Sequence, residues 1–443
     1  MKQRWLLGLV LVGLVAVGCG GSSSGDDDDS GDGGGADGGG GADAGPRVSN
    51  IKHVVIVVQE NHTFDNYFGR YCTAPAGSNP TCTVGPACCE RAPDRDPSGA
   101  LPIVLDDAAN GGYDPNHDQD CELSEMNGGA MDRFVTGASC SNPKNWAISP
   151  DALMATYHGY AASGALADRY FQSAVGASSS NDMFFAVAKF VFKDNSFKPD
   201  TVGQGCIAPL TPKARYTGQT TIADLLLQGG HSFAYYAMGF RAMHEALLCP
   251  AAPSDCTSII GAVCNYDPSD VPFQYYAQFE DGGMYASSMR DTDAFFTDIA
   301  MGQLPEVSFL KAAAYKNEHP NFSTKISNGV AFVSSVVDAV ATSRYASDTL
   351  VLVTWDEGGG FFDHVRPPAS PDANPLGTRV PLLALGRFAR ANMVSHVELE
   401  HASVVRFLEL NFLGATGQLG ARDVTAANLG SLLDASKTGI VIP

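Results

Sequence analysis

Two uninterrupted runs of apolar, mostly β-branched residues constrain the fold of this chain more than any other feature. They are His53-Val-Val-Ile-Val-Val58 and Thr349-Leu-Val-Leu-Val-Thr354. A run without polar alternation is typical of a strand that is buried on both faces of a parallel sheet. An amphipathic stretch from about Ser327 to Arg344 precedes the second run, so helix and strand alternate. The sequence therefore predicts an α/β fold with a mostly parallel central sheet flanked by helices.

Shorter segments extend this alternation. Pro305 to Leu310 and Val380 to Leu385 are predicted strands, and Glu398 to Leu413 is a predicted closing helix. A chain of 443 residues is long enough for one large domain of this kind, or for a core that carries insertions;.

Polar residues follow both apolar runs directly. Glu60 and Asn61 come after the first run, and Asp356 and Glu357 after the second. Ligands of open parallel sheets bind beyond the carboxyl ends of the strands, so we expect these four side chains to share one site. The alternative is that acids end strands only because loops are polar. The glycines after Glu357 favour the site, since they leave room for a ligand.

A serine-rich turn is the second candidate for chemistry. Gly176-Ala-Ser-Ser-Ser-Asn-Asp182 precedes an apolar stretch, Met183 to Phe192, which we predict to be helical. The N–H groups at a helix N-terminus stabilise a phosphate or a deprotonated hydroxyl. The alternative is that these residues are helix caps, because Ser and Asn are preferred there. The lipase pattern Gly-x-Ser-x-Gly is not met, since Ser180 replaces its last glycine.

The cysteines indicate an oxidising compartment. Of the eleven cysteines, all but Cys19 fall in two groups, at 72–140 and 206–264. Ten such cysteines allow up to five disulfides, and without a Cys-x-x-Cys pair a zinc site made of cysteines is not expected. We interpret the two groups as loop-rich insertions stapled by disulfides, at about 72–140 and 200–290.

The N-terminus has the order of a secretory signal. Lys2 and Arg4 precede an apolar run that ends in Ala16-Val-Gly-Cys19, and this run is shorter than the about 20 residues that span a bilayer. Small residues before a cysteine resemble the lipobox of bacterial lipoproteins. We interpret residues 1–18 as a signal peptide and residues 19–46 as a lipidated Cys19 with a Gly/Asp-rich flexible tether.

These features predict an exported protein. We expect a lipoprotein of the bacterial cell envelope, held in the membrane through Cys19. The outer membrane is favoured because Gly20 is not an aspartate. An ordinary cleaved signal, with secretion of the protein, is the alternative.

Net charge limits the partners. The chain has 28 Lys and Arg against 48 Asp and Glu, a net charge of −20. Affinity for a polyanion requires a basic surface, and the sequence shows no local basic run. Nucleic acid is therefore not an expected partner.

Taken together, several segments resemble the bacterial phosphoesterase family of phospholipases C and acid phosphatases, within the alkaline-phosphatase-like superfamily. The longest are the segment at 51–69, which contains Gln59-Glu-Asn-His-Thr-Phe64, and Trp355-Asp-Glu-Gly-Gly-Gly-Phe-Phe-Asp-His-Val365. The shorter ones are Asn127-Gly-Gly-Ala-Met-Asp-Arg-Phe134, Ala165-Leu-Ala-Asp-Arg-Tyr170, Asn317-Glu-His-Pro320 and Gly377-Thr-Arg-Val-Pro381. The resemblance implies that residues 47–443 form the phosphoesterase catalytic domain, with an alkaline-phosphatase-like fold.

The resemblance also implies a set of site residues. One divalent metal ion (Ca²⁺, Mg²⁺, Mn²⁺, Zn²⁺ or iron) would be held by Glu60, Asn61, Ser178, Asp356 and Glu357. Ser178 would be the nucleophile, and Asn181 matches a family asparagine three residues later. His117 and His319 correspond to histidines that contact the phosphoryl oxygens or the leaving group.

This chain also departs from the family pattern. Relatives commonly read Gly-Pro-Thr-x-Pro-Asn-Arg at the nucleophile, which leaves Ser179 as an alternative to Ser178. Relatives often carry a histidine where this chain has Asp270, so either part of the phosphate-binding set is missing here or His231 or His244 supplies it.

The expected function is an exported, metal-dependent phosphoric-ester hydrolase of the phospholipase C or acid phosphatase type, acting through a phosphoseryl intermediate on a small phosphate ester or a phospholipid. The altered segment around Ser178 keeps a second hypothesis open: a surface-tethered binding protein on the same fold, catalytically impaired.

Overall fold

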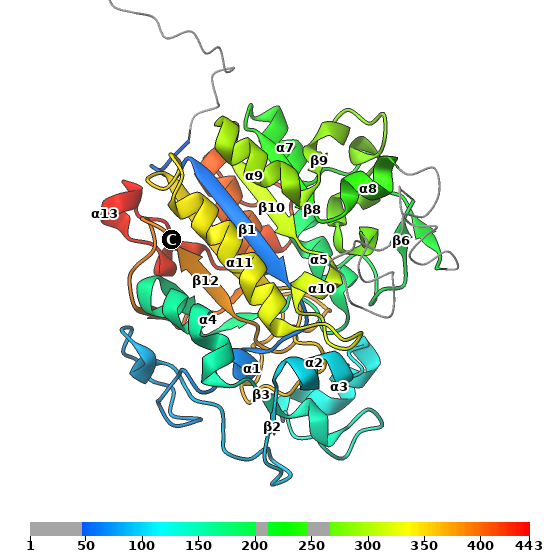
Figure 1. The fold of residues 1–443 in the computed structure, drawn as a ribbon, viewed down its shortest axis with the longest axis vertical. Coiled ribbons are helices and arrows are strands. Elements are labelled where there is room, and N and C mark those ends of the chain that lie inside the picture. The colour runs from blue at the N-terminus through cyan, green and yellow to red at the C-terminus, as the bar shows by residue number, and fades with distance from the viewer. Residues whose placement is uncertain (1–46, 201–210, 246–265) are drawn as a thin grey trace, which may run out of the picture. The chain divides into compact units, whose positions relative to one another are not determined.

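A central eight-stranded sheet organises the molecule (Figure 1). The computed structural model describes residues 47–200, 211–245 and 266–443, which belong to one compact unit. The strand order is β13-β4-β12-β11-β1-β10-β8-β9. In chain order the strands are β1 His53–Gln59, β4 Ala165–Ala167, β8 Phe233–Ala237, β9 Met289–Arg290, β10 Val307–Lys311, β11 Thr349–Trp355, β12 Leu382–Leu385 and β13 Met393–Ser395.

The sheet is mostly parallel, as predicted. The neighbours β11, β1, β10, β8 and β9 all run parallel, whereas β12 is antiparallel to both β11 and β4. The two apolar runs are adjacent strands, with Val54 opposite Leu350 and Gln59 opposite Trp355. Every residue of β11 is buried, and all of β1 after His53. The carboxyl ends of β1, β10 and β11 therefore lie at one edge of the sheet.

Helices cover both faces of the sheet, which explains why its strands lack polar alternation. In Figure 1, α11 (Ile326–Ala341), α9 (Thr292–Met301) and α4 (Asp151–Ser163) lie in front of the sheet. On the other face, α12 (His401–Leu408) packs against α5 (Ser178–Val187). The fold is the expected α/β architecture.

The remaining elements are short. The helices are α1 Phe64–Phe68, α2 Asp107–Gly112, α3 Gln119–Met126, α7 Ile222–Gln228, α8 Phe240–Glu245, α10 Ala314–Asn317 and α13 Ala435–Thr438. The small strand pairs are β2 Ile103–Val104 with β3 Ala147–Ile148, β5 Tyr170–Phe171 with β14 Leu399–Glu400, and β6 Lys198–Pro199 with β7 Lys213–Ala214.

The first predicted insertion is stapled by disulfides. Its bridges are Cys72–Cys89, Cys82–Cys88 and Cys121–Cys140, all within the 72–140 group. The cysteines of the second group lie outside the described residues. The second segment, about 200–290, is not simply an insertion, because it supplies β8 to the central sheet. The prediction missed this strand because Phe233-Ala-Tyr-Tyr-Ala237 has no β-branched residue.

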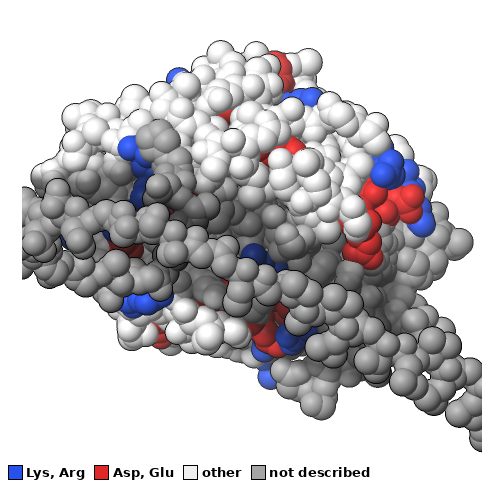
Figure 2. Space-filling model, turned by 90° about the horizontal axis from the view of Figure 1, so that it is seen from above, with Lys and Arg blue, Asp and Glu red and all other residues white. Residues whose placement is uncertain are grey.

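The predicted signal, Cys19 and the tether lie outside the described residues. Among the helices that are described, none combines the length and the apolar character needed to cross a bilayer. Figure 2 shows one face of the molecule, on which the basic and acidic side chains of the described residues are interspersed.

Candidate active site

The two predicted pairs of polar residues meet at the carboxyl edge of the sheet. Asp356 donates its backbone N–H to the carbonyl of Gln59 at 3.0 Å, which continues the ladder between β1 and β11 by one step. The backbone N–H of Asn61 donates in turn to Asp356 Oδ1 at 3.3 Å. Glu60, Asn61, Asp356 and Glu357 are all buried.

A tight backbone turn holds Asn61 in place. Asn61 has a φ of 60°, in the left-handed region that Asn tolerates better than most residues;. Gly359 passes so close that a Cβ at this position would lie 2.4 Å from the Asn61 carbonyl oxygen. Gly359 also has a positive φ of 66°. The glycine run after Glu357 is therefore required by a close approach of two backbones at the site.

Ser178 faces this edge from α5. It is the first residue of the helix, after Ala177 as N-cap, and its Oγ lies 3.5 Å from Asn61 Oδ1. The N-cap residue itself has no capping side chain, and the Asn195 side chain accepts from the Ser179 N–H instead. Ser178 is thus not the helix cap that the alternative interpretation required, and it lies in the first turn of the helix, where the helix dipole favours negative charge.

The neighbours of Ser178 have other contacts. The side-chain amide of Asn181 hydrogen-bonds to the preceding loop. Its Oδ1 accepts from the Ala174 N–H at 2.9 Å, and its Nδ2 donates to the Gly176 carbonyl at 2.8 Å. Ser179 is fully buried and donates its backbone N–H to Asn195. The structure therefore places Ser178 at the site, and Asn181, in the same helix, against the loop that precedes it.

His117 and His319 lie on the open side of the carboxylates, with ring centroids 6.1 Å apart. In both rings Nδ1 faces a backbone carbonyl, of Pro115 at 2.8 Å and of Pro320 at 2.7 Å. A carbonyl only accepts, so Nδ1 carries the proton and Nε2 is left for other partners. His117 Nε2 lies 3.6 Å from Glu357 Oε1, and His319 Nε2 lies 3.9 Å from Glu60 Oε2.

A lysine that the sequence analysis missed lies among the acids. Lys311, the last residue of β10, is buried with its Nζ 3.1 Å from Glu60 Oε1, 3.3 Å from Asp356 Oδ2 and 3.4 Å from Asp182 Oδ2. We call Glu60, Asp182, Lys311 and Asp356 the Lys311 cluster. Burial alone would lower the pKa of Lys311, but the surrounding carboxylates raise it well above its usual value. The predicted strand ended at Leu310, one residue short of this side chain.

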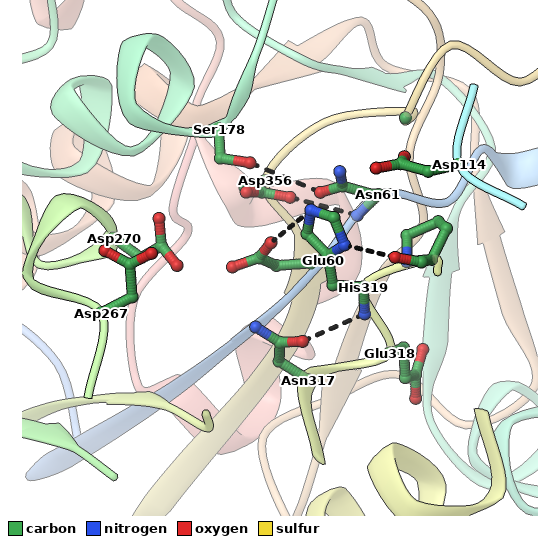
Figure 3. Close-up of polar contacts among 12 residues, drawn as sticks. Glu60, Asn61, Asp114, Ser178, Asp267, Asp270, Asn317, Glu318, His319 and Asp356 are labelled. Atoms are coloured by element: carbon green, nitrogen blue, oxygen red, sulfur yellow. Dashed lines mark hydrogen bonds and ion pairs between the residues drawn. The ribbon is translucent and has the colours of Figure 1, made fainter. Parts of the chain in front are cut away.

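Asp270, where relatives carry a histidine, joins the same group. It hydrogen-bonds the carboxyl of Glu60, and Figure 3 shows Glu60 between Asp270 and His319. The expectation that His231 or His244 fills this place is wrong. His231 pairs with Glu306 at the amino ends of β8 and β10, and His244 pairs with Asp281.

Several buried oxygens at this edge have no hydrogen-bond partner within the described part of the chain: Glu60 Oε1, Asp182 Oδ1 and Glu357 Oε1. For Glu60 this holds although Lys311 Nζ lies nearby, because the geometry is not that of a hydrogen bond. Burial and the neighbouring Asp356 and Glu122 raise the pKa of Glu357 well above its usual range, and burial likewise raises that of Asp182. Uncompensated buried oxygens of this kind fit a hard divalent cation.

A second group of side chains could also bind a metal ion, but all of its carboxylate oxygens have hydrogen-bond partners. Asp65, Asp363 and His364 offer atoms within 4.8 Å of one another, a geometry that could hold an ion. With Arg379 they form what we call the Arg379 cluster. Arg379 donates to both carboxylates, at 2.8 Å to Asp363 and 3.1 Å to Asp65, and His364 Nδ1 lies 2.8 Å from Asp65 Oδ2. Because every carboxylate oxygen here has a partner, these atoms are already neutralised by protein.

His401 supports the site from behind. Its Nε2 donates to the backbone carbonyl of Asp356 at 2.6 Å, and its Nδ1 pairs with the Tyr170 hydroxyl at 2.7 Å. Burial lowers the pKa of His401 to about 4, so the ring is neutral at pH 7.

Comparison with known proteins gives consistent matches. The model of the Phosphoesterase family matches residues 51–413. Phospholipase C B of Mycobacterium tuberculosis (strain H37Rv) is 25% identical over 437 residues, covering 88% of this chain and 79% of that protein. Non-hemolytic phospholipase C of Pseudomonas aeruginosa is 32% identical over 172 residues, 31% of this chain and 25% of that protein. A solved structure of a protein in the alkaline phosphatase superfamily from Vibrio parahaemolyticus is 11% identical, covers 87% of this chain and 74% of that chain, and has a TM-score of 0.39.

Proposed function

Because this chain belongs to the phosphoesterase family and is a hydrolase of phosphoric esters, we propose that it cleaves its substrate with Ser178 as nucleophile at a site for one divalent metal ion. The observation that carries the proposal is the position of Ser178 Oγ, 3.5 Å from Asn61 Oδ1 at the N-terminus of α5, at the same sheet edge as Glu357 Oε1, a buried oxygen without a hydrogen-bond partner among the described residues.

The ligands of the proposed ion are Glu60, Asn61, Ser178, Asp356 and Glu357, an all-oxygen set. When bound, the ion would lower the pKa of the serine hydroxyl and neutralise charge on the phosphoryl oxygens.

The protein's own groups supply the rest of the chemistry. Ser178 lies in the first turn of α5, where the helix dipole favours the negative charge on the phosphoryl oxygens as the Ser178 oxygen forms its bond to phosphorus;. The bond from phosphorus to the leaving oxygen breaks, and that oxygen needs a proton. The Ser178 hydroxyl loses its proton as its oxygen attacks, and Nε2 of His117 or His319 can accept that proton and pass it to the leaving oxygen, because Nδ1 of each ring is committed to a backbone carbonyl;. Water then hydrolyses the phosphoserine.

The substrate class follows the relatives that span most of the chain. They are phospholipases C by name, so we propose a phosphodiester of the phospholipid type, with phosphomonoesters as the alternative. We also propose that the protein is exported and anchored through Cys19, in keeping with the signal-like N-terminus and the disulfides of the folded domain.

A matched pair of variants tests the proposal. Ser178→Ala should lower kcat/KM by about 10³-fold or more toward p-nitrophenyl phosphorylcholine or p-nitrophenyl phosphate, whichever the wild type prefers. Ser179→Ala, one residue along the same helix, should remain within about tenfold of wild type, since Ser179 does not reach Asn61. Excess chelator should abolish wild-type turnover. Full activity of Ser178→Ala, or of metal-free protein, would contradict the mechanism.

A further inference from the structure

Lys311 divides the carboxylates of the active site into two compartments. Glu60 turns Oε1 to Lys311, at 3.1 Å, and Oε2 to His319, at 3.9 Å. Asp356 turns Oδ2 to Lys311, at 3.3 Å, and Oδ1 to the backbone N–H groups of Asn61 and Glu357. The same two residues thus border an outer compartment next to Ser178 and an inner compartment that contains the lysine ammonium.

The inner compartment holds more negative groups than the lysine can balance. Besides Glu60 and Asp356, it is bordered by Asp182, one helical turn beyond Ser178, and by Asp270 through Glu60. These are four carboxyl groups against one ammonium. Asp182 Oδ1 has no partner among the described residues although Asp182 is only 1% exposed.

The ammonium of Lys311 occupies a position among the carboxylates that a bound metal ion could also occupy. Its Nζ lies 3.1 to 3.4 Å from three carboxylates, whereas a charge-assisted hydrogen bond to a single carboxylate is about 2.7–2.9 Å. The ammonium is therefore shared among the three acids and is not bonded closely to one of them. Carboxylates that converge on one point from three elements, β1, α5 and the end of β11, form the kind of oxygen cage that binds a divalent cation.

We propose that the ammonium of Lys311 occupies a latent second metal-binding site, formed by Glu60, Asp182, Asp270 and Asp356, and so restricts the enzyme to the single ion of the outer compartment. The inference rests on the proposed function, because it takes the outer compartment as the place of the catalytic ion. Ions in two-metal sites lie about 3.5–4 Å apart and share carboxylates, as Glu60 and Asp356 would be shared here.

Lys311 is thus a positioning residue that touches the acids and not the substrate. Its ammonium balances the repulsion between the shared carboxylates in the metal-free protein, and its positive charge excludes a second cation. Replacing it by Met keeps the length of the side chain and removes the charge, which leaves the inner oxygens free for a metal.

The test counts metal ions directly. Wild type, Lys311→Met and Lys52→Met are stripped with chelator, reloaded with Mn²⁺ and passed through gel filtration. Bound manganese per chain is then measured by elemental analysis, together with the electron paramagnetic resonance spectrum. Lys52 is a matched control, because it forms an ion pair with Asp348 just before β1, at the opposite end of that strand.

We expect Lys311→Met to bind one manganese ion more than wild type and to show the spectrum of two coupled ions, and Lys52→Met to match wild type. An equal count in Lys311→Met and wild type would overturn the inference, as would a wild type that already binds two coupled ions. If wild type binds none and Lys311→Met binds one, the inner site stands and the proposed metal dependence of the wild-type reaction fails.

A second variant tests the inference in case Lys311→Met does not fold. If the unbalanced acids prevent Lys311→Met from folding, Lys311→Met combined with Asp182→Asn removes a negative charge along with the positive one. The double variant should fold and return to the wild-type manganese count, because an inner ligand is gone. An extra ion in the double variant would show that Asp182 does not help to form the site, and would overturn the inference as stated.

Discussion

The molecule buries two clusters of charged side chains, and they differ in how their charges are balanced. In the Arg379 cluster, the negative charges of Asp65 and Asp363 are balanced by the Arg379 guanidinium and by His364. Burial alone would lower the pKa of His364, but the charge of Asp65 and the hydrogen bonds to Asp65 and Glu90 raise it to about 9. In the Lys311 cluster, one ammonium faces three carboxylates, and Glu60 Oε1 and Asp182 Oδ1 have no hydrogen-bond partner among the described residues.

The comparison separates a structural cluster from a functional one. A buried carboxylate without a partner costs stability, and a fold retains this cost where the unpaired atoms bind something. The Arg379 cluster ties the segment after β1 to the segment after β11 and has nothing left to offer a ligand. The Lys311 cluster lies beside Ser178 and contains oxygens that have no hydrogen-bond partner among the described residues. Substitutions in the two clusters should therefore affect different properties.

The largest expected effect is on turnover, from the Lys311 cluster. Asp356→Asn keeps the shape of the side chain and removes one of the carboxylates that face Lys311 and the proposed ion. We expect kcat/KM to fall by about 10³-fold, while the melting temperature in chelator stays at or above that of wild type because repulsion between buried acids is relieved. If Asp356→Asn lost much stability while the folded protein kept normal turnover, the Lys311 cluster would be structural, and the distinction between the two clusters would be wrong.

The next effect is on stability, from the Arg379 cluster. Arg379→Met leaves Asp65 and Asp363 buried without their main partner, and breaking a buried pair in this way costs about 3–5 kcal/mol. Urea denaturation measures the loss, and turnover per folded molecule should change little. Arg241→Met removes an exposed pair with Asp293 and should cost less than about 1 kcal/mol. Equal losses in the two variants would show that the Arg379 cluster contributes nothing special.

The pH dependence of stability sharpens the same contrast. The folded pKa of His364, about 9, lies above the value of 6.5 for a free histidine. Its contribution is therefore complete below pH 6.5 and is lost as pH rises through about 9. The difference corresponds to about 3 kcal/mol at most. Denaturation curves between pH 6 and 10 should show this loss in wild type, and a flatter profile in His364→Gln.

The smallest effect is expected outside both clusters. Cys19→Ser should change where the protein is found and leave kcat/KM within about twofold of wild type, because two acyl chains anchor a protein without entering its fold. Fractionation of cells that express both forms measures the distribution. If Cys19→Ser stays with the membranes as wild type does, the lipid anchor is wrong.

Local sequence patterns predicted the features that local chemistry determines. The β-branched runs identified β1 and β11, and the parallel-sheet rule placed Glu60 and Asp356 together before any contact was known. The cysteine groups predicted disulfides in two insertions, and the first group, at 72–140, does form three bridges. In each case the signal was contained in a few consecutive residues.

Features that depend on tertiary contacts were missed. β8 has an aromatic and alanine composition that does not stand out, so its segment was taken for an insertion. Asp182 was hidden inside a segment interpreted only for its serine and asparagine, and nothing in the sequence shows that it meets Lys311 across the sheet edge. The Arg379 cluster was missed for the same reason, because partners such as Asp65 and Arg379 lie far apart in the sequence.

The central claim, that Ser178 is the group at the sheet edge that attacks phosphorus, can be tested in one measurement. Wild-type protein is mixed with a phosphate ester that it turns over and quenched in acid within milliseconds to seconds, and its peptides are mapped by mass spectrometry. The account predicts a transient phosphate on Ser178, absent from Ser178→Ala. Phosphate on Ser179 or another residue, or the same labelled peptide in Ser178→Ala, would contradict it.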